Sequence, residues 1–131
     1  MEKPELTNIV PVNVDGVDII NTTPHEITFG VGDHAVVNVP PMVLINAAAK
    51  EKPVRNEDGV ELVKTVFEAT DEGKDIIAEL KGKFANAVIV GSIIAAQAFP
   101  GDVVGMTPCP GFERVPPAEK RMNPHKFTTF E

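Results

Sequence analysis

The sequence has 131 residues, 43% of them hydrophobic and 24% charged, and this composition is typical of one globular domain with one core. The net charge of −7 argues against nucleic acids and anionic membranes as partners, because both select basic surfaces. A single cysteine, Cys109, excludes an internal disulfide, and no apolar run is long enough for a membrane span. The charged start, Met1 to Glu5, predicts that there is no secretory leader.

After a predicted tail over residues 1–8, three turn signals divide the chain into hairpins. Asp15-Gly16, Gly32-Asp33 and Asp58-Gly59 each lie between apolar runs and predict tight turns. The expected strand pairs are 9–14 with 17–23, 25–31 with 35–39, and 53–55 with 60–67. Residues 42–49 are expected to be a strand followed by irregular chain.

One helix is expected over residues 71–81. Thr70 is a suitable N-cap, and Asp71 and Glu72 lie at the positive end of the helix. Apolar residues at helical spacing, among them Ile76 and Leu80, predict a buried stripe. Gly82 is expected to end the helix.

The segment 85–104 combines several consistent signals. The β-branched run 88–90 predicts a short buried strand, and Gly91-Ser92 ends it. Ser92 then caps an apolar helix over 93–99, which Pro100-Gly101 terminates. A second short strand starts at residue 102. We expect this segment to form the centre of the core.

Five prolines are spread through the last 25 residues and predict an extended C-terminal arm over 107–131. The arm is slightly basic while residues 1–104 are acidic, which suits an arm that lies on a neighbouring acidic copy. The fold expected for residues 9–106 is α+β: a mainly antiparallel sheet or small barrel with one buried and one amphipathic helix. The residues expected to make the arm's protein contacts are Pro108, Pro110, Phe112, Pro116, Pro117, Phe127 and Phe130.

Two polar clusters are candidates for a ligand site. In Thr22-Thr23-Pro24-His25, Thr23 and His25 could contact a ligand, or the threonine hydroxyls could satisfy backbone groups at a strand bend. Gly91 and Ser92 could bind an anion through backbone amides, or serve as a tight turn and helix cap.

The sequence does not predict an enzyme, a metal site or a cofactor. Cys109 and the three histidines, His25, His34 and His125, lack the paired spacing of metal ligands. Val90-Gly91-Ser92-Ile93-Ile94 is neither a nucleophile elbow nor a phosphate-binding loop. No other polar residues have a known catalytic spacing.

The order of motifs resembles a family of small, uncharacterised proteins found in bacteriophages, prophages and their bacterial hosts. Asn21-Thr22-Thr23-Pro24-His25-Glu26-Ile27 is similar to that family's opening "N-L-T-P-H-x-I". Residues 62–67, 88–98 and 102–104 resemble its "V-V-R-T-x-F", "Y-I-V-S-x-x-V-A-x-A" and "D-L-V-V-P" segments. The helix over 71–81 and the proline-rich arm depart from the family. The resemblance implies a phage connection and a compact fold, without catalytic roles.

Two functions follow as hypotheses. The first is a non-enzymatic phage structural or assembly protein, such as a capsid decoration or accessory subunit, whose arm contacts other copies or other phage structural proteins. Its expected location is the virion or the host cytoplasm. The second is an oligomeric binder of a small anionic ligand, such as a signalling nucleotide, through Thr23, His25, Gly91 and Ser92. The scarcity of arginines counts against the second hypothesis.

Overall fold

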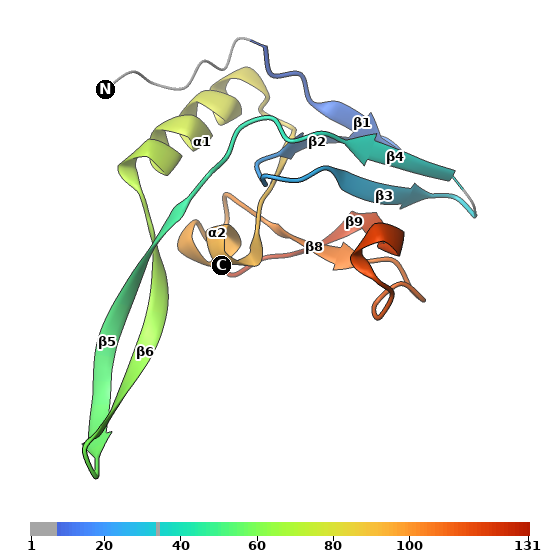
Figure 1. Ribbon diagram of the computed structural model, residues 1–131. Helices are drawn as coiled ribbons and strands as arrows, with labels where there is room; N and C mark the ends of the chain where they lie inside the picture. Colours follow the sequence, from blue (N-terminus) through green and yellow to red (C-terminus); the bar gives the residue numbers. More distant parts are fainter. Residues whose placement is uncertain (1–7, 34) are drawn as a thin grey trace.

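The computed structural model describes residues 8–33 and 35–131, so most of the predicted N-terminal tail lies outside the described residues. The protein is a β-rich α+β fold (Figure 1). In chain order its elements are β1 (Val12–Val14), β2 (Val17–Asn21), β3 (Ile27–Val31), β4 (Ala35–Val39), β5 (Ala47–Glu57), β6 (Val60–Ala69), α1 (Asp71–Lys83), β7 (Val88–Val90), α2 (Ile93–Ala98), β8 (Gly105–Pro108), the 3₁₀ helix η1 (Pro117–Glu119) and β9 (Met122–Thr128).

The strands form two sheets and a separate hairpin. One sheet has the order β1-β2-β7, the other β4-β3-β9-β8, and β5 pairs with β6 alone. The three predicted hairpins are confirmed as β1–β2, β3–β4 and β5–β6, all antiparallel. The pairs β2–β7 and β3–β9 are parallel. A bridge between Val90 and Val104 connects the first sheet to the chain that enters β8.

Left-handed backbone at the turns explains two of the hairpin signals. Asp15 and Gly16 have φ values of 49° and 89°, and Asp58 and Gly59 have values of 49° and 79°. Positive φ at both central residues defines the type I′ turn, whose twist matches that of the flanking strands. Aspartate followed by glycine is one of the few pairs that adopt this conformation readily.

Two apolar clusters lie on opposite sides of β2 and β7. Ile19 and Val90 belong to the cluster between the two sheets, which also contains Phe29. Ile20 and Ile89 belong to the cluster beneath the helices. Strands buried on both faces are apolar along their whole length, and this explains the continuous run at 88–90.

Both predicted helix caps are confirmed. The Thr70 hydroxyl accepts a hydrogen bond from the Gly73 amide at the start of α1, and the Ser92 hydroxyl accepts one from the Ala95 amide at the start of α2. Helix α1 continues through Gly82 to Lys83, so the predicted stop at Gly82 is wrong. Within the described residues, no helix has the length and apolar character needed to cross a membrane.

The C-terminal segment differs from the predicted extended arm. Strand β9 lies between β3 and β8 within the four-stranded sheet. Pro124 is buried in β9 at a place where the register against β8 is irregular, and such a place tolerates a residue without an amide hydrogen. The Phe127 ring packs edge-on against Phe29, with 6.5 Å between the ring centroids. Residues 105–131 are therefore part of the folded body.

The order of strand and irregular chain within residues 42–49 is the reverse of the prediction. The amides of Met42 and Ile45 donate to the carbonyls of Asn21 and Thr22, at 3.0 and 3.3 Å, so this stretch is anchored to the end of β2. The ladder of β5 starts afterwards, at Ala47. Helical propensity in the alanine run is overridden by pairing with β6.

Candidate functional site

The segment Asn21 to His25, which carries the most distinctive motif in the sequence, forms a corner between β2 and β3. The buried Asn21 amide nitrogen donates to the carbonyls of His25 and Val39, at 2.7 and 3.0 Å. Its amide oxygen accepts from the Thr23 amide at 2.8 Å and from the Thr23 hydroxyl at 2.7 Å. Asn21 thus ties its own strand to the chain that enters β3 and to the end of β4, and this motif has a structural role.

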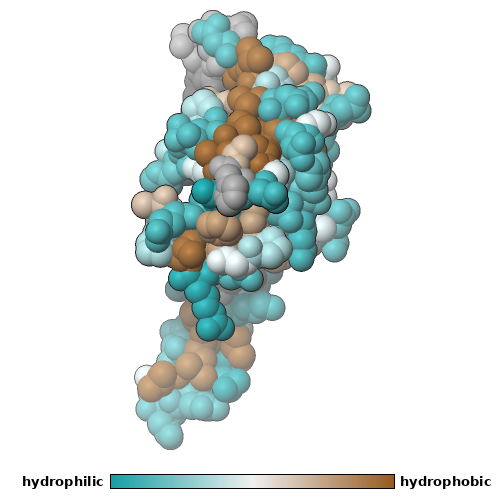
Figure 2. Space-filling view, turned by 90° about the vertical axis from the view of Figure 1, so that its right-hand side faces the viewer, coloured by the Kyte–Doolittle hydropathy of each residue, from teal (hydrophilic) through white to brown (hydrophobic). Residues whose placement is uncertain are grey.

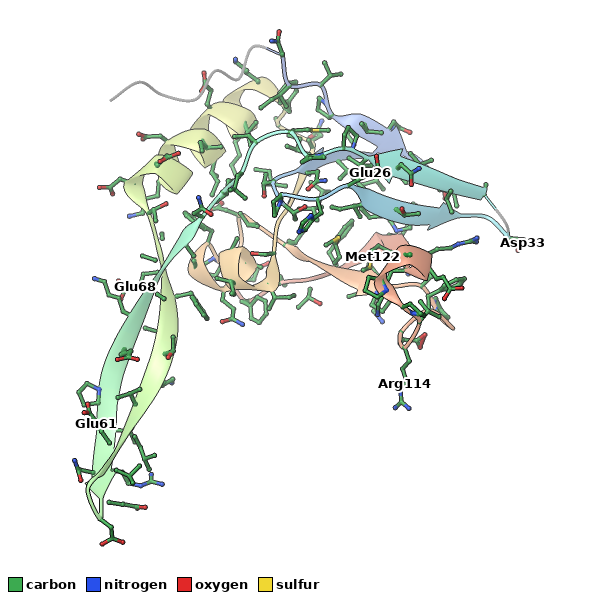
Figure 3. The ribbon with its side chains drawn as sticks, in the orientation of Figure 1. Glu26, Asp33, Glu61, Glu68, Arg114 and Met122 are labelled. Atoms are coloured by element: carbon green, nitrogen blue, oxygen red, sulfur yellow. The ribbon has the colours of Figure 1, made fainter. Side chains whose placement is uncertain are left out.

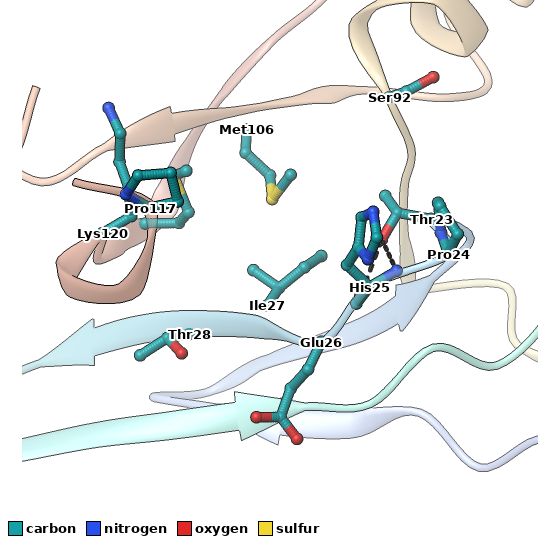
Figure 4. Close-up of a pocket in the computed structure, with 11 residues that line it drawn as sticks. Thr23, Pro24, His25, Glu26, Ile27, Thr28, Ser92, Met106, Pro117 and Lys120 are labelled. Carbon is teal, nitrogen blue, oxygen red and sulfur yellow. Dashed lines mark hydrogen bonds between the residues drawn. The ribbon is translucent and has the colours of Figure 1, made fainter.

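The hydroxyls of the two threonines at the corner also form hydrogen bonds within the chain. The Thr22 hydroxyl donates to the Val90 carbonyl at 2.8 Å and links β2 to β7. Thr23 is almost fully buried, and its hydroxyl lies between the Asn21 side chain and the His25 backbone. Figure 4 shows the contact between Thr23 and His25. Of the two alternatives predicted for the threonines, the structure therefore shows the second: their hydroxyls form hydrogen bonds with backbone groups at a strand bend.

The Gly91-Ser92 turn is also engaged in the fold. The Gly91 amide donates to the Val104 carbonyl at 2.9 Å, so it is not available to an anion. A side chain at Gly91 would come within 2.6 Å of a Val103 methyl group, and this explains the glycine. The Ser92 hydroxyl caps α2.

A pocket of about 470 Å³ nevertheless brings three of the four predicted ligand residues together. Its lining comes from the corner, β3, the start of α2, β8, η1 and β9, and consists of Thr23, Pro24, His25, Glu26, Ile27, Thr28, Ser92, Met106, Pro117, Lys120 and Met122. Gly91 does not line it. The sequence analysis missed the pocket residues that η1 and β9 contribute, because it predicted residues 107–131 to be an extended arm outside the folded domain.

The chemistry of this pocket favours an apolar guest over an anion. Ile27, Met106 and Met122 contribute hydrocarbon and thioether surface. The Lys120 ammonium donates to the Glu113 carbonyl at 2.7 Å, and Glu26 adds a negative charge at the rim. The Glu26 carboxylate extends away from the His25 ring in Figure 4, so these two groups do not form an acid–base pair.

The residues predicted to make the arm's contacts are distributed over the C-terminal part of the body. Pro108 ends β8, and Pro117 starts η1 behind Pro116. The Arg121 guanidinium lies over the Phe112 ring, 5.1 Å from its centroid. Pro110 is exposed, and Phe130 is 40% exposed. These residues do not form one continuous arm.

The residues considered for a metal site are separated. His125 is paired with Asp15, with 2.9 Å between ring nitrogen and carboxylate oxygen, and Cys109 lies beside Gly30 and Arg121. Neither shares the pocket of His25. His34 lies outside the described residues, and the described part of the chain contains no group of three His, Cys, Asp or Glu side chains that could hold a metal.

A different surface stands out in the structure, the projecting hairpin β5–β6. It extends away from the body as a two-stranded ribbon, and Figure 3 shows Glu68 near its base and Glu61 near its far end. Its apolar side chains include Val54, Val60 and Val63, which are 55%, 58% and 38% exposed. Figure 2 shows apolar residues among hydrophilic ones on this projection.

The register of the hairpin separates its charges by face. Residues directly opposite each other point to the same face, so Lys50, Lys52 and Arg55 share a face with their partners Val66, Lys64 and Leu62. An irregularity between Pro53 and Arg55 keeps Arg55 in this set. We call this surface the cationic face: Lys50, Lys52, Arg55, Val60, Leu62, Lys64 and Val66, together with the acidic residues Glu57 and Glu68, which form ion pairs with Arg55 and Lys50. The opposite face carries Glu51 and Glu61 and no cation.

Comparisons with protein-family models, curated proteins and solved structures give no match for this chain.

Proposed function

We propose that this chain is a non-enzymatic structural or assembly protein that contacts neighbouring copies of itself through the β5–β6 hairpin. The observation that carries the proposal is the isolation of this hairpin: β5 and β6 pair with each other and with no other described strand. The contact role expected for the C-terminal segment is thereby transferred to a different part of the chain.

The low stability expected of an isolated two-stranded ribbon supports a contact between the hairpin and a neighbouring subunit. An isolated hairpin is marginal in water, and stable sheets need a third strand or a packed face. Near its base the hairpin contributes Phe67 and Ala69 to the core, while residues 49–61 are all exposed. A neighbouring subunit would bury the exposed valines and stabilise the outer part of the ribbon.

The resemblance to phage and prophage proteins supports a virion component as the specific form of this role. A capsid decoration or accessory subunit is present in many copies, and repeated copies allow each projecting hairpin to reach the next subunit. The virion, or the host cytoplasm before assembly, is the corresponding location.

Trimming the hairpin tests the proposal. Ala49 and Phe67 are opposite each other in the ladder, so residues 50–66 can be replaced by Asn-Gly, which favours a tight turn. We expect the trimmed chain to keep a cooperative thermal transition and to sediment as a monomer at concentrations where the intact chain self-associates. A trimmed chain that self-associates like the intact one would overturn the proposal.

A matched control keeps the ribbon at full length. Asp58→Asn retains a residue that accepts positive φ before Gly59, so it preserves the type I′ turn. This variant should self-associate like the intact chain. Its loss of association would show that the assay responds to changes unrelated to hairpin length.

The convergence of Thr23, His25 and Ser92 on one pocket favours a second candidate, binding of a small anionic ligand. The fully engaged Thr23 hydroxyl and the apolar lining make it the weaker of the two. Nucleoside phosphates at millimolar concentration should raise the melting temperature if this candidate is correct, and His25→Ala should remove the increase. An absence of any thermal shift would eliminate it.

A further inference from the structure

The cationic face of the hairpin contains a cross-strand pair of like charges, which is unfavourable within one chain. Lys52 and Lys64 are direct cross-strand partners, and like charges in this arrangement destabilise a ribbon. Neighbouring cations are paired locally, Lys50 with Glu68 at 3.2 Å and Arg55 with Glu57 at 2.7 Å. Lys52 and Lys64 form no ion pair with any residue that the structure describes. Their repulsion is relieved where an anionic surface covers the face.

An acidic surface of suitable shape is present on the same molecule. Asp71, Asp75 and Glu79 follow one another at four-residue intervals along the exposed side of α1, with Glu72 beside them. Glu79 is paired with Lys83 at 3.7 Å. The negative end groups Asp71 and Glu72 also stabilise the start of the helix, whereas Asp75 lies one turn further on, where that effect has faded.

The two surfaces of one copy cannot meet. The hairpin and α1 leave their common junction near Ala69 and Thr70 in different directions, as Figure 1 shows. The hairpin holds four cationic and five acidic side chains, so most of the net charge of −7 lies on the rest of the chain. A second copy therefore offers the hairpin an acidic surface.

We propose that the cationic face of the hairpin docks on the acidic side of α1 in a second copy of this chain. Lys52 and Lys64 then lie against Asp71 and Asp75, and Val60 and Leu62 are covered along with them. Two different surfaces of the chain meet in this contact, so it forms twice in a two-fold dimer or once per neighbour in a ring or filament. A polyanion such as nucleic acid is a poorer occupant, because Glu57 shares the cationic face and Asp58 and Glu61 also lie at the far end of the hairpin. This inference rests on the proposed function and names the surface that the hairpin contacts.

Charge-reversal variants test this contact by sedimentation velocity on the full-length protein. The hairpin variant is Lys52→Glu with Lys64→Glu, and the helix variant is Asp71→Lys with Asp75→Lys. Each alone should self-associate more than about tenfold more weakly than the intact chain, because like charges then oppose each other. Mixed in equal amounts, the two variants should associate again, since each supplies the surface that complements the other.

The outcomes separate this inference from the proposed function. Hairpin and helix variants that associate as the intact chain does, or that fail to associate when mixed, would overturn docking on α1. If the trimmed chain is monomeric in the same assay, the hairpin remains the assembling element and docks elsewhere. Circular dichroism and thermal melting of each variant must match the intact chain. If the helix variant Asp71→Lys with Asp75→Lys unfolds, Asp75→Lys with Glu79→Lys replaces it. This second variant changes the charge by the same amount and leaves the start of the helix intact.

Discussion

The corner at Asn21 and the projecting hairpin contrast in how their polar and apolar groups are satisfied. At the corner, Asn21 and Thr22 are fully buried and every polar atom of their side chains has a partner in the same chain. On the hairpin, exposed valines and the opposed lysines Lys52 and Lys64 lack such partners among the described residues. The difference indicates that the distinctive motif holds the fold together, while the less distinctive hairpin is available for contacts with other molecules.

The largest expected effect on stability comes from Asn21. Asn21→Ala would leave the Thr23 amide without its acceptor and would remove the hydrogen bonds from Asn21 to the carbonyls of His25 and Val39. We expect a loss of about 2–4 kcal/mol in the free energy of unfolding, measured by urea denaturation. Asn56→Ala, on the exposed hairpin, is the matched control and should change stability by less than about 0.5 kcal/mol. Equal effects at the two positions would contradict the contrast between the regions.

Two glycines of α1 provide the next comparison. An added methyl group at Gly73 would lie 2.4 Å from the Phe99 ring, whereas nothing lies within 4 Å of one at Gly82. Gly73→Ala should therefore destabilise the protein by about 1–3 kcal/mol through overpacking. Gly82→Ala should stabilise it by about 0.5–1 kcal/mol, because alanine is the better helix former. A stabilising Gly73→Ala would show that α1 does not pack against Phe99 as described.

On the hairpin, an exposed apolar residue should contribute little to folding. Val63→Thr replaces an exposed methyl group by a hydroxyl of similar size, so stability in dilute solution should change by less than about 0.5 kcal/mol. Val90→Thr buries the same hydroxyl in the core and should cost about 1–3 kcal/mol. Thermal melts of both variants in dilute solution measure this difference, and a large loss in Val63→Thr would contradict an unpartnered hairpin.

The smallest effect is expected at His25. Its backbone carbonyl and amide take part in the corner, while its ring is exposed at the pocket. His25→Ala keeps the backbone contacts and should change stability by less than about 0.5 kcal/mol. Urea denaturation that showed a loss comparable to that of Asn21→Ala would assign the ring a structural role.

Local signals predicted the local structure well. The confirmed predictions each depend on residues within a few positions of one another. They are the turns at Asp15-Gly16 and Asp58-Gly59, the helix caps Thr70 and Ser92, and the buried strand 88–90. The pairing of β9 with β3 depends on segments about 95 residues apart along the chain. No turn or cap encodes that pairing, and five nearby prolines indicated extended chain instead.

The candidate site shows the same limit. The sequence analysis grouped Thr23, His25 and Ser92 as ligand candidates without predicting the β2–β7 pairing, and it could not reveal that Asn21 engages Thr23. It predicted the far end of the β5–β6 hairpin and missed its extension to Ala47. Charged residues and valines are mixed along both strands of this hairpin. This pattern was the signal in the sequence that the rest of the chain covers neither face of the hairpin.

Hydrogen–deuterium exchange on the intact protein, in dilute and in self-associated samples, tests the central claim most directly. Backbone amides of residues 50–66 should exchange rapidly when dilute and become protected on association, because a partner then covers the ribbon. Amides of β2 and β7 should be protected in both samples, since the body folds without a partner. Association that left residues 50–66 as rapidly exchanging as before would contradict the hairpin as the element that joins one copy to the next.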